Sequence, residues 1–228
     1  MKIFKLVLVM FLCFVLFGQT VVAQTALKMT LLSNYGKGEG ESKGVFAAGS
    51  LVFYGIGSKM QIASYSNPSA PVKIASVELS EVIEFLVRTS INSTQYVVAS
   101  GGSKLWLINV QDPTKPALVS STTVGTGVTC EGLATSGTYA YIAAGSGGFK
   151  IYSISNPASP SLLATVDSSV YCESVVISGQ YAYVASNTTP DYQGKSFIYD
   201  ISNPAAPVHK STIMGYGGYH QYLSVRGG

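Results

Sequence analysis

The chain has 228 residues, of which 47% are hydrophobic and only 11% are charged, and its formal net charge is +3 at pH 7. So small a basic excess is not the electrostatic footprint of a nucleic-acid-binding protein, and it supplies no polybasic patch for a membrane surface. Three cysteines are too few for a disulfide-dense scaffold, so a large apolar core is expected to stabilise the chain.

Residues 1–23 are predicted to be a signal peptide. Lys2 and Lys5 form a charged start, residues 6–17 are almost wholly apolar, and Val21-Val22-Ala23 fits a small-residue cleavage site. The apolar run is short for a transmembrane helix, and no later run is long enough to span a bilayer. We therefore expect a secreted, periplasmic or cell-surface protein with no membrane span after cleavage. A retained N-terminal anchor is the alternative.

A proline motif, Asn-Pro-x-x-Pro, recurs along the rest of the chain. It begins at Asn67, Asn156 and Asn203, and a fourth copy begins at Asp112, so that successive copies are 45, 44 and 47 positions apart. These copies contain eight of the nine prolines. A period of this size is typical of repeated units that bury their apolar faces only against one another. We interpret each motif as a turn, in which the Asn or Asp side chain bonds its own backbone two residues on and proline fixes φ.

Each repeat carries signals for four short strands. In the third repeat they are expected near 132–136, 138–143, 149–154 and 161–166, bounded by Gly and Pro signals, and no helical period appears after residue 23. Three columns of residues recur and are interpreted as core: Phe53, Tyr96, Tyr141 and Tyr183 in the second strand, Ile62, Leu107, Ile151 and Ile198 in the third, and Tyr65, Val110, Ile154 and Ile201 just after it.

Four antiparallel strands in each unit of about 40–45 residues predict an all-β fold, a β-propeller of four-stranded blades. The propeller is expected to cover residues 24–228, with blades at about 42–80, 81–124, 128–168 and 170–214. Residues 26–33 would be an outer closing strand, and residues 219–228 the inner strand of a further blade. This order leads us to expect an incomplete propeller, the fragment of a longer protein.

The last two repeats resemble the LVIVD-repeat family. The resemblance is carried by residues 179–185 (GQYAYVA) and 197–207 (FIYDISNPAAP), and again by 139–143 (YAYIA) and 151–157 (IYSISNP). The first two repeats depart from this pattern at Gly55, Trp106 and Gln111. The resemblance covers about residues 27–228 and implies a secreted or surface-attached β-propeller. It implies no particular chemistry, because the family has no single known one.

One column at the start of the inner strands could carry a function: Lys43, Glu84, Glu131, Glu173 and Gln221. Inner strands line the central channel of a propeller, so these side chains would form a partly negative mouth that could bind a cation or a ligand amine. A hydrated channel mouth without a ligand is the alternative. The same face is expected to carry Tyr171, Tyr219, His220 and a long loop with Asp191 and Tyr192, which complete the predicted binding site.

The residues before that column include Cys130 and Cys172, at equivalent positions of neighbouring blades. An oxidising compartment favours a disulfide, but the bond requires Cα atoms about 4.4–6.8 Å apart. A disulfide and two buried free thiols both remain open at this point.

No catalytic, cofactor or metal motif is recognisable, since the sequence has no Gly-x-Ser-x-Gly elbow, no Walker loop and no Cys-x-x-Cys. We therefore expect a non-enzymatic binding or scaffold module without a cofactor, with an unknown protein or carbohydrate as its partner. A propeller hydrolase or lyase that uses the mouth carboxylates as acid and base is the alternative.

Overall fold

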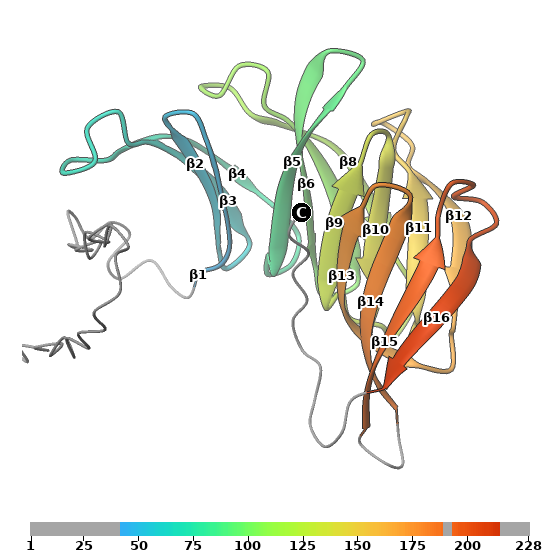
Figure 1. The fold of residues 1–228 in the computed structure, drawn as a ribbon. Helices are drawn as coiled ribbons and strands as arrows, with labels where there is room; N and C mark the ends of the chain where they lie inside the picture. The colour runs from blue at the N-terminus through green and yellow to red at the C-terminus, as the bar shows by residue number, and fades with distance from the viewer. Residues whose placement is uncertain (1–41, 189–192, 215–228) are drawn as a thin grey trace, which may run out of the picture. The chain divides into compact units, whose positions relative to one another are not determined.

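All regular structure in the described part of the chain is β. The computed structural model describes residues 42–188 and 193–214, which lie within one compact unit, residues 32–228. Over these residues sixteen strands form four antiparallel sheets, and in each sheet the strands follow one another in chain order (Figure 1). No helix in the described ranges is long and apolar enough to cross a bilayer.

The four sheets are the predicted four-stranded blades. The first contains β1 (Ser42–Ala48), β2 (Leu51–Ile56), β3 (Lys59–Ser64) and β4 (Val72–Glu78), and the second β5 (Phe85–Ile91), β6 (Thr94–Gly101), β7 (Lys104–Asn109) and β8 (Ala117–Thr123). The third contains β9 (Gly132–Ser136), β10 (Tyr139–Ala143), β11 (Phe149–Ser153) and β12 (Ser161–Val166), and the fourth β13 (Tyr171–Ser178), β14 (Tyr181–Thr188), β15 (Gln193–Asp200) and β16 (Val208–Met214). The predicted fold class, an all-β propeller of four-stranded blades, is confirmed.

Neighbouring blades pack face to face, because successive residues of a strand point to opposite faces of its sheet. In β6, Val97 packs in a cluster with Phe53 of the first blade, whereas Val98 packs in a cluster with Ile142 of the third. In β10, Tyr141 points the other way from Ile142, into a third cluster that contains Tyr199 of the fourth blade. Strands β6 and β10 are therefore buried on both faces, whereas Tyr183 of β14 and Ile198 of β15 are only partly buried. The second and third blades thus require a neighbour on each side to exclude water from their apolar side chains.

The proline motifs form the turns that the sequence predicts. In every copy the side-chain oxygen of the first residue accepts the backbone N–H two residues on: Asn67 from Ser69 at 3.1 Å, Asp112 from Thr114 at 2.9 Å, Asn156 from Ala158 at 3.3 Å and Asn203 from Ala205 at 3.2 Å. Its carbonyl also accepts the N–H three residues on, at 3.0 Å in all four copies. These turns connect the third strand of each blade to the fourth.

Three residues of the predicted core columns, Tyr65, Tyr183 and Ile198, are only partly buried, and the second-strand column is also misaligned at one position. Strand pairing places Val98 opposite Leu107, in the place that Phe53, Tyr141 and Tyr183 occupy in the other blades. Tyr96 pairs with Asn109 and is instead equivalent to Tyr139, which pairs with Ser153. The β5–β6 hairpin is two residues longer on each strand, with its tip at Asn92 and Ser93, and it projects beyond the hairpin β9–β10 in Figure 1. Counting from the hairpin tip therefore misaligns this blade.

Candidate functional site

A repeated backbone contact joins the start of three inner strands, β5, β9 and β13, to the preceding blade. The N–H of Ile83 donates to the carbonyl of Gly57 at 2.9 Å, that of Cys130 to Gly102 at 2.8 Å, and that of Cys172 to Gly145 at 3.0 Å. All three glycines lie between the second and third strands of the preceding blade, with φ of 56°, 51° and 52°. An L-residue rarely adopts this left-handed conformation, so glycine suits the contact.

The contact also accounts for the two cysteines. Cys130 and Cys172 are both free and buried, and they pack in different apolar clusters. Burial raises the pKa of each thiol to about 12. Of the two alternatives left open by the sequence, the structure has free thiols, which serve as small apolar side chains at the join between two blades.

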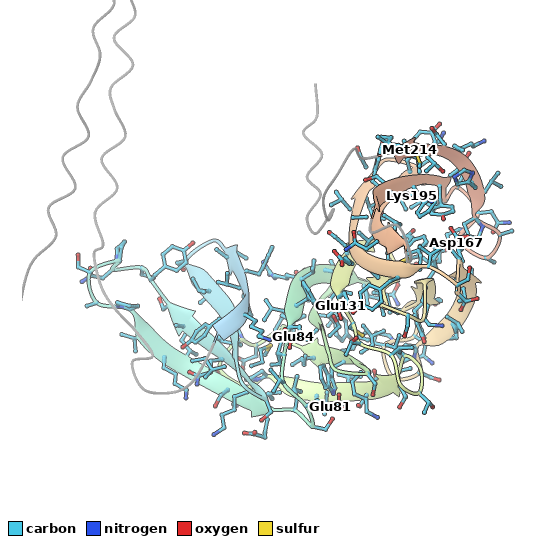
Figure 2. The ribbon with its side chains drawn as sticks, turned by 90° about the horizontal axis from the view of Figure 1, so that it is seen from below. Glu81, Glu84, Glu131, Asp167, Lys195 and Met214 are labelled. Carbon is cyan, nitrogen blue, oxygen red and sulfur yellow. The ribbon has the colours of Figure 1, made fainter. Side chains whose placement is uncertain are left out.

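The residues that follow this contact, Glu84, Glu131 and Glu173, line one cavity of about 660 Å³. Its walls come from the inner strands β1, β5, β9 and β13 and from the residues just before β5 and β9. Figure 2 shows Glu84 and Glu131 near one another on neighbouring blades, with Glu81 farther out. The remaining lining is Lys43, Tyr171 and the mainly apolar set Gly44, Val45, Phe85, Leu86, Val87 and Leu133.

Each carboxylate of the cavity has one oxygen engaged by a different partner. Glu84 Oε1 lies 3.0 Å from Lys43 Nζ in an ion pair. Glu131 Oε1 accepts the hydroxyl proton of Tyr171 at 2.8 Å. Glu173 Oε1 accepts a hydrogen bond from the side-chain amide of Asn187. With one lysine against three carboxylates, the lining has an excess of negative charge.

Glu173 stands out because its second oxygen is buried and has no hydrogen-bond partner among the residues that the structure describes. The Oδ1 atom of Asn187, a residue only 7% exposed, is also buried without one. Burial is the main cause that raises the pKa of Glu173, the charge of Glu131 raises it further, and the bond from Asn187 opposes both. Over the described ranges, two acceptor oxygens on side chains joined by a hydrogen bond thus lack a donor, whereas most buried polar atoms in proteins have one. Of these two residues, Glu173 lines the cavity.

The raised pKa of Glu173 gives a stability prediction with a definite sign. The folded state keeps this proton to higher pH than the unfolded chain, so its contribution to stability is fully present below the ordinary value of 4.5 and is lost as pH rises through the folded value. Urea unfolding of wild type and Glu173→Gln from about pH 4 to about pH 8 should therefore show the difference, wild type minus variant, falling with pH.

A difference that rises with pH, or does not change, would contradict this prediction. The pKa of Asp112 is lowered by bonds from Thr114 and that of Asp200 by bonds from Ser202, so both act in the opposite direction. Because both groups are present in the two proteins, they cancel in the comparison.

The structure places four of the predicted site residues at the same cavity: Glu84, Glu131, Glu173 and Tyr171. The others, Asp191, Tyr192, Tyr219, His220 and Gln221, lie outside the described residues. Within residues 42–188 and 193–214, no group of three or more His, Cys, Asp or Glu side chains could hold a metal ion.

Sequence reasoning missed Asn187 and the apolar wall. A signal for Asn187 exists in the repeat, because it occupies the position of Gly57, Gly102 and Gly145 in the other blades. An asparagine in a glycine column brings an amide to the edge of the mouth, where it reaches Glu173.

Comparison with known proteins identifies the repeat and supports the fold. Residues 129–168 and 171–214 match the LVIVD repeat. The computationally designed Ika4 protein is similar at 14% identity and a TM-score of 0.55, over 75% of this chain and 98% of that one. A functionally unknown protein from Desulfotomaculum acetoxidans DSM 771 is similar at 14% identity and a TM-score of 0.59, over 75% of this chain and 56% of that one. Likeness at this identity shows the fold alone, and no curated protein matches the chain.

Proposed function

Since residues 129–168 and 171–214 are LVIVD repeats, we propose that the protein is an exported, non-enzymatic β-propeller that serves as a binding or scaffold module at the cell surface or outside the cell. The cavity lined by Glu84, Glu131 and Glu173 carries this proposal. At about 660 Å³ it has the size of a small-ligand site, and it combines apolar walls with a few convergent polar groups. Those groups stand on or beside strands of rigid blades, which suits recognition.

Export is supported by the composition of residues 1–23, a charged start, an apolar stretch and small residues before Gln24. The mass of the protein recovered outside the cytoplasm is expected to correspond to a chain that begins at Gln24. A membrane-bound product that retains Met1 would instead identify an anchor.

One observation favours the second candidate, a hydrolase or lyase. The charge of Glu131 contributes to the raised pKa of Glu173. A general acid that works beside a second carboxylate needs such a raised pKa. Against this, Glu131 accepts a hydrogen bond from the hydroxyl of Tyr171, and Glu173 accepts one from the side-chain amide of Asn187. Such bonds suit a fixed recognition surface, and we therefore place binding first.

The proposal is tested with a variant that fills the cavity mouth without removing a buried side chain. Val45 lines the cavity and is 68% exposed, so Val45→Trp adds bulk to the mouth with little loss of buried contact. Val72, 62% exposed at the start of β4, does not line the cavity, and Val72→Trp is the matched control. A panel of amines, amino acids, saccharides and short peptides is screened by ligand-detected NMR.

A panel member is expected to bind wild type and Val72→Trp alike and to lose binding to Val45→Trp, with all three proteins unfolding at the same temperature. If no member binds up to millimolar concentration, or if binding survives in Val45→Trp, the proposal fails. Turnover of a panel member that disappears in Glu173→Gln would identify the second candidate instead.

A further inference from the structure

We propose that the corner of the cavity formed by Glu131 and Glu173 binds a primary alkylammonium group, such as a lysine side chain or a free amine. This inference rests on the proposed function, because it assigns a ligand class to the same cavity. It is supported by the ion pair in the cavity, by buried acceptors without donors, and by the apolar wall beside them.

The protein itself holds an ammonium group in the equivalent place on neighbouring blades. Lys43 and Glu84 belong to the same column as Glu131 and Glu173, and Lys43 Nζ lies 3.0 Å from Glu84 Oε1. Farther along the column two carboxylates follow each other, and among the described residues no Lys, Arg or His forms an ion pair with either. A ligand ammonium would supply there the positive charge that Lys43 supplies to Glu84.

Acceptors that lack donors are the independent second observation. Within residues 42–188 and 193–214, Glu173 Oε2 and Asn187 Oδ1 are both buried without a hydrogen-bond partner, and Asn187 is more than nine-tenths buried and bonded to Glu173. An ammonium group carries three N–H donors and no acceptor, so it can donate to the carboxylate oxygens of Glu131 and Glu173 that Tyr171 and Asn187 do not engage. A neutral hydroxyl could also donate, but it would leave the repulsion between Glu131 and Glu173 uncompensated.

The shape of the carboxylates favours ammonium over guanidinium. Glu131 and Glu173 each have one oxygen occupied, by Tyr171 and Asn187 respectively. A guanidinium fork prefers both oxygens of one carboxylate, whereas an ammonium group acts as a point charge with rotatable donors. One engaged oxygen on each carboxylate therefore removes the usual advantage of arginine.

The apolar lining of the cavity is the reason for proposing a ligand whose ammonium group is attached to an alkyl chain. Leu86, Val87 and Leu133 form part of the same cavity wall. A lysine-like chain can cover such a surface with its methylene groups while its charged head reaches the carboxylates. A bare metal ion would gain nothing from these side chains, and the described residues contain no metal-binding cluster.

The test uses N-acetyl-lysine methylamide as the probe, with titration calorimetry at low ionic strength. Binding to wild type is expected, and Glu131→Gln and Glu173→Gln are each expected to weaken it about tenfold or more, because a charge-assisted hydrogen bond is lost. Glu78→Gln is the matched control, since Glu78 pairs with Lys59 and Ser58 and does not line the cavity. It should bind the probe like wild type.

Three further ligands define the chemistry. The same probe acetylated on its side-chain amine should not bind, and the arginine analogue should bind more weakly than the lysine probe. Pentylammonium separates the two possible sources of the group: binding equal to the lysine probe indicates a free amine as a sufficient ligand, and weaker binding indicates a lysine within a peptide.

Equal binding of the acetylated probe, or unchanged affinity in both Gln variants, would overturn the inference. If the lysine probe does not bind but another panel member is lost in Val45→Trp, the ammonium assignment fails and the proposed function stands. If the lysine probe binds Val45→Trp as it binds wild type, both fail. Thermal unfolding is measured for each variant, and if Glu173→Gln does not fold, Glu131→Gln carries the test.

Discussion

Replacing Tyr141 by Ala should lower the free energy of unfolding by about 3–5 kcal/mol, the usual cost of truncating a large core aromatic. Tyr141 is 2% exposed and packs between the third and fourth blades, where its ring stacks on Phe149 at a centroid distance of 6.3 Å. Phe149 in turn stacks on Tyr199 of the fourth blade at 5.6 Å. The truncation therefore leaves a cavity at the blade interface, and denaturant unfolding measures its cost.

Tyr141→Phe is the matched control, because it keeps the ring and removes only the hydroxyl. It should cost about 1 kcal/mol or less, the typical net worth of one hydrogen bond. Equal losses in the two variants, or a loss below about 1 kcal/mol in Tyr141→Ala, would mean that this ring does not hold the two blades together.

The second large effect is expected for Gly101→Ala, which should lower the free energy of unfolding by about 2–3 kcal/mol through overpacking. A Cβ atom at this position would lie 1.9 Å from the carbonyl oxygen of Val82 and 3.0 Å from the backbone nitrogen of Glu84. The segment before β5 must then move. That movement strains the Ile83–Gly57 contact and displaces Glu84 from Lys43.

Gly179→Ala separates this clash from the general cost of losing a glycine. Gly179 has φ of 56° at a hairpin tip, and no heavy atom lies within 4 Å of the added Cβ. The Gly179→Ala substitution should therefore cost about 1–2 kcal/mol, from the left-handed backbone alone. Urea unfolding of both variants makes the comparison. If Gly101→Ala is no less stable than Gly179→Ala, the close approach of Val82 to β6 is not a rigid feature of the fold.

Those parts of the fold that depend on short stretches of sequence are predictable without a structure. The turn at Asn67 uses atoms within five residues, and its Asn side chain accepts the N–H of Ser69 as local turn geometry requires. Because the motif recurs at nearly constant spacing, the same turn can be predicted in every blade. The column of Glu84, Glu131 and Glu173 follows from the same periodicity, since equivalent residues of successive inner strands line one cavity.

Features that depend on pairing between strands are not predictable in this way. Tyr96 is misaligned because the β5–β6 hairpin is longer than the others. The correct alignment becomes visible only when each residue of β6 is matched with its partner in β7. Glu173 lies at an irregularity of the β13–β14 pairing, between Cys172 and Ser174, and there it accepts the bond from Asn187. A bulge of this kind re-aims a side chain by one position, and nothing in the local sequence marks it.

The most direct measurement is the pKa of Glu173 by carboxyl NMR titration, with and without saturating N-acetyl-lysine methylamide. In the free protein its pKa should lie above the ordinary value of 4.5, because the carboxylate is partly buried and close to Glu131. With the probe bound, the adjacent ammonium should stabilise the charged carboxylate and lower this pKa. A Glu173 pKa that stays the same when the probe is saturating would contradict the claim that this cavity recognises a cationic ligand.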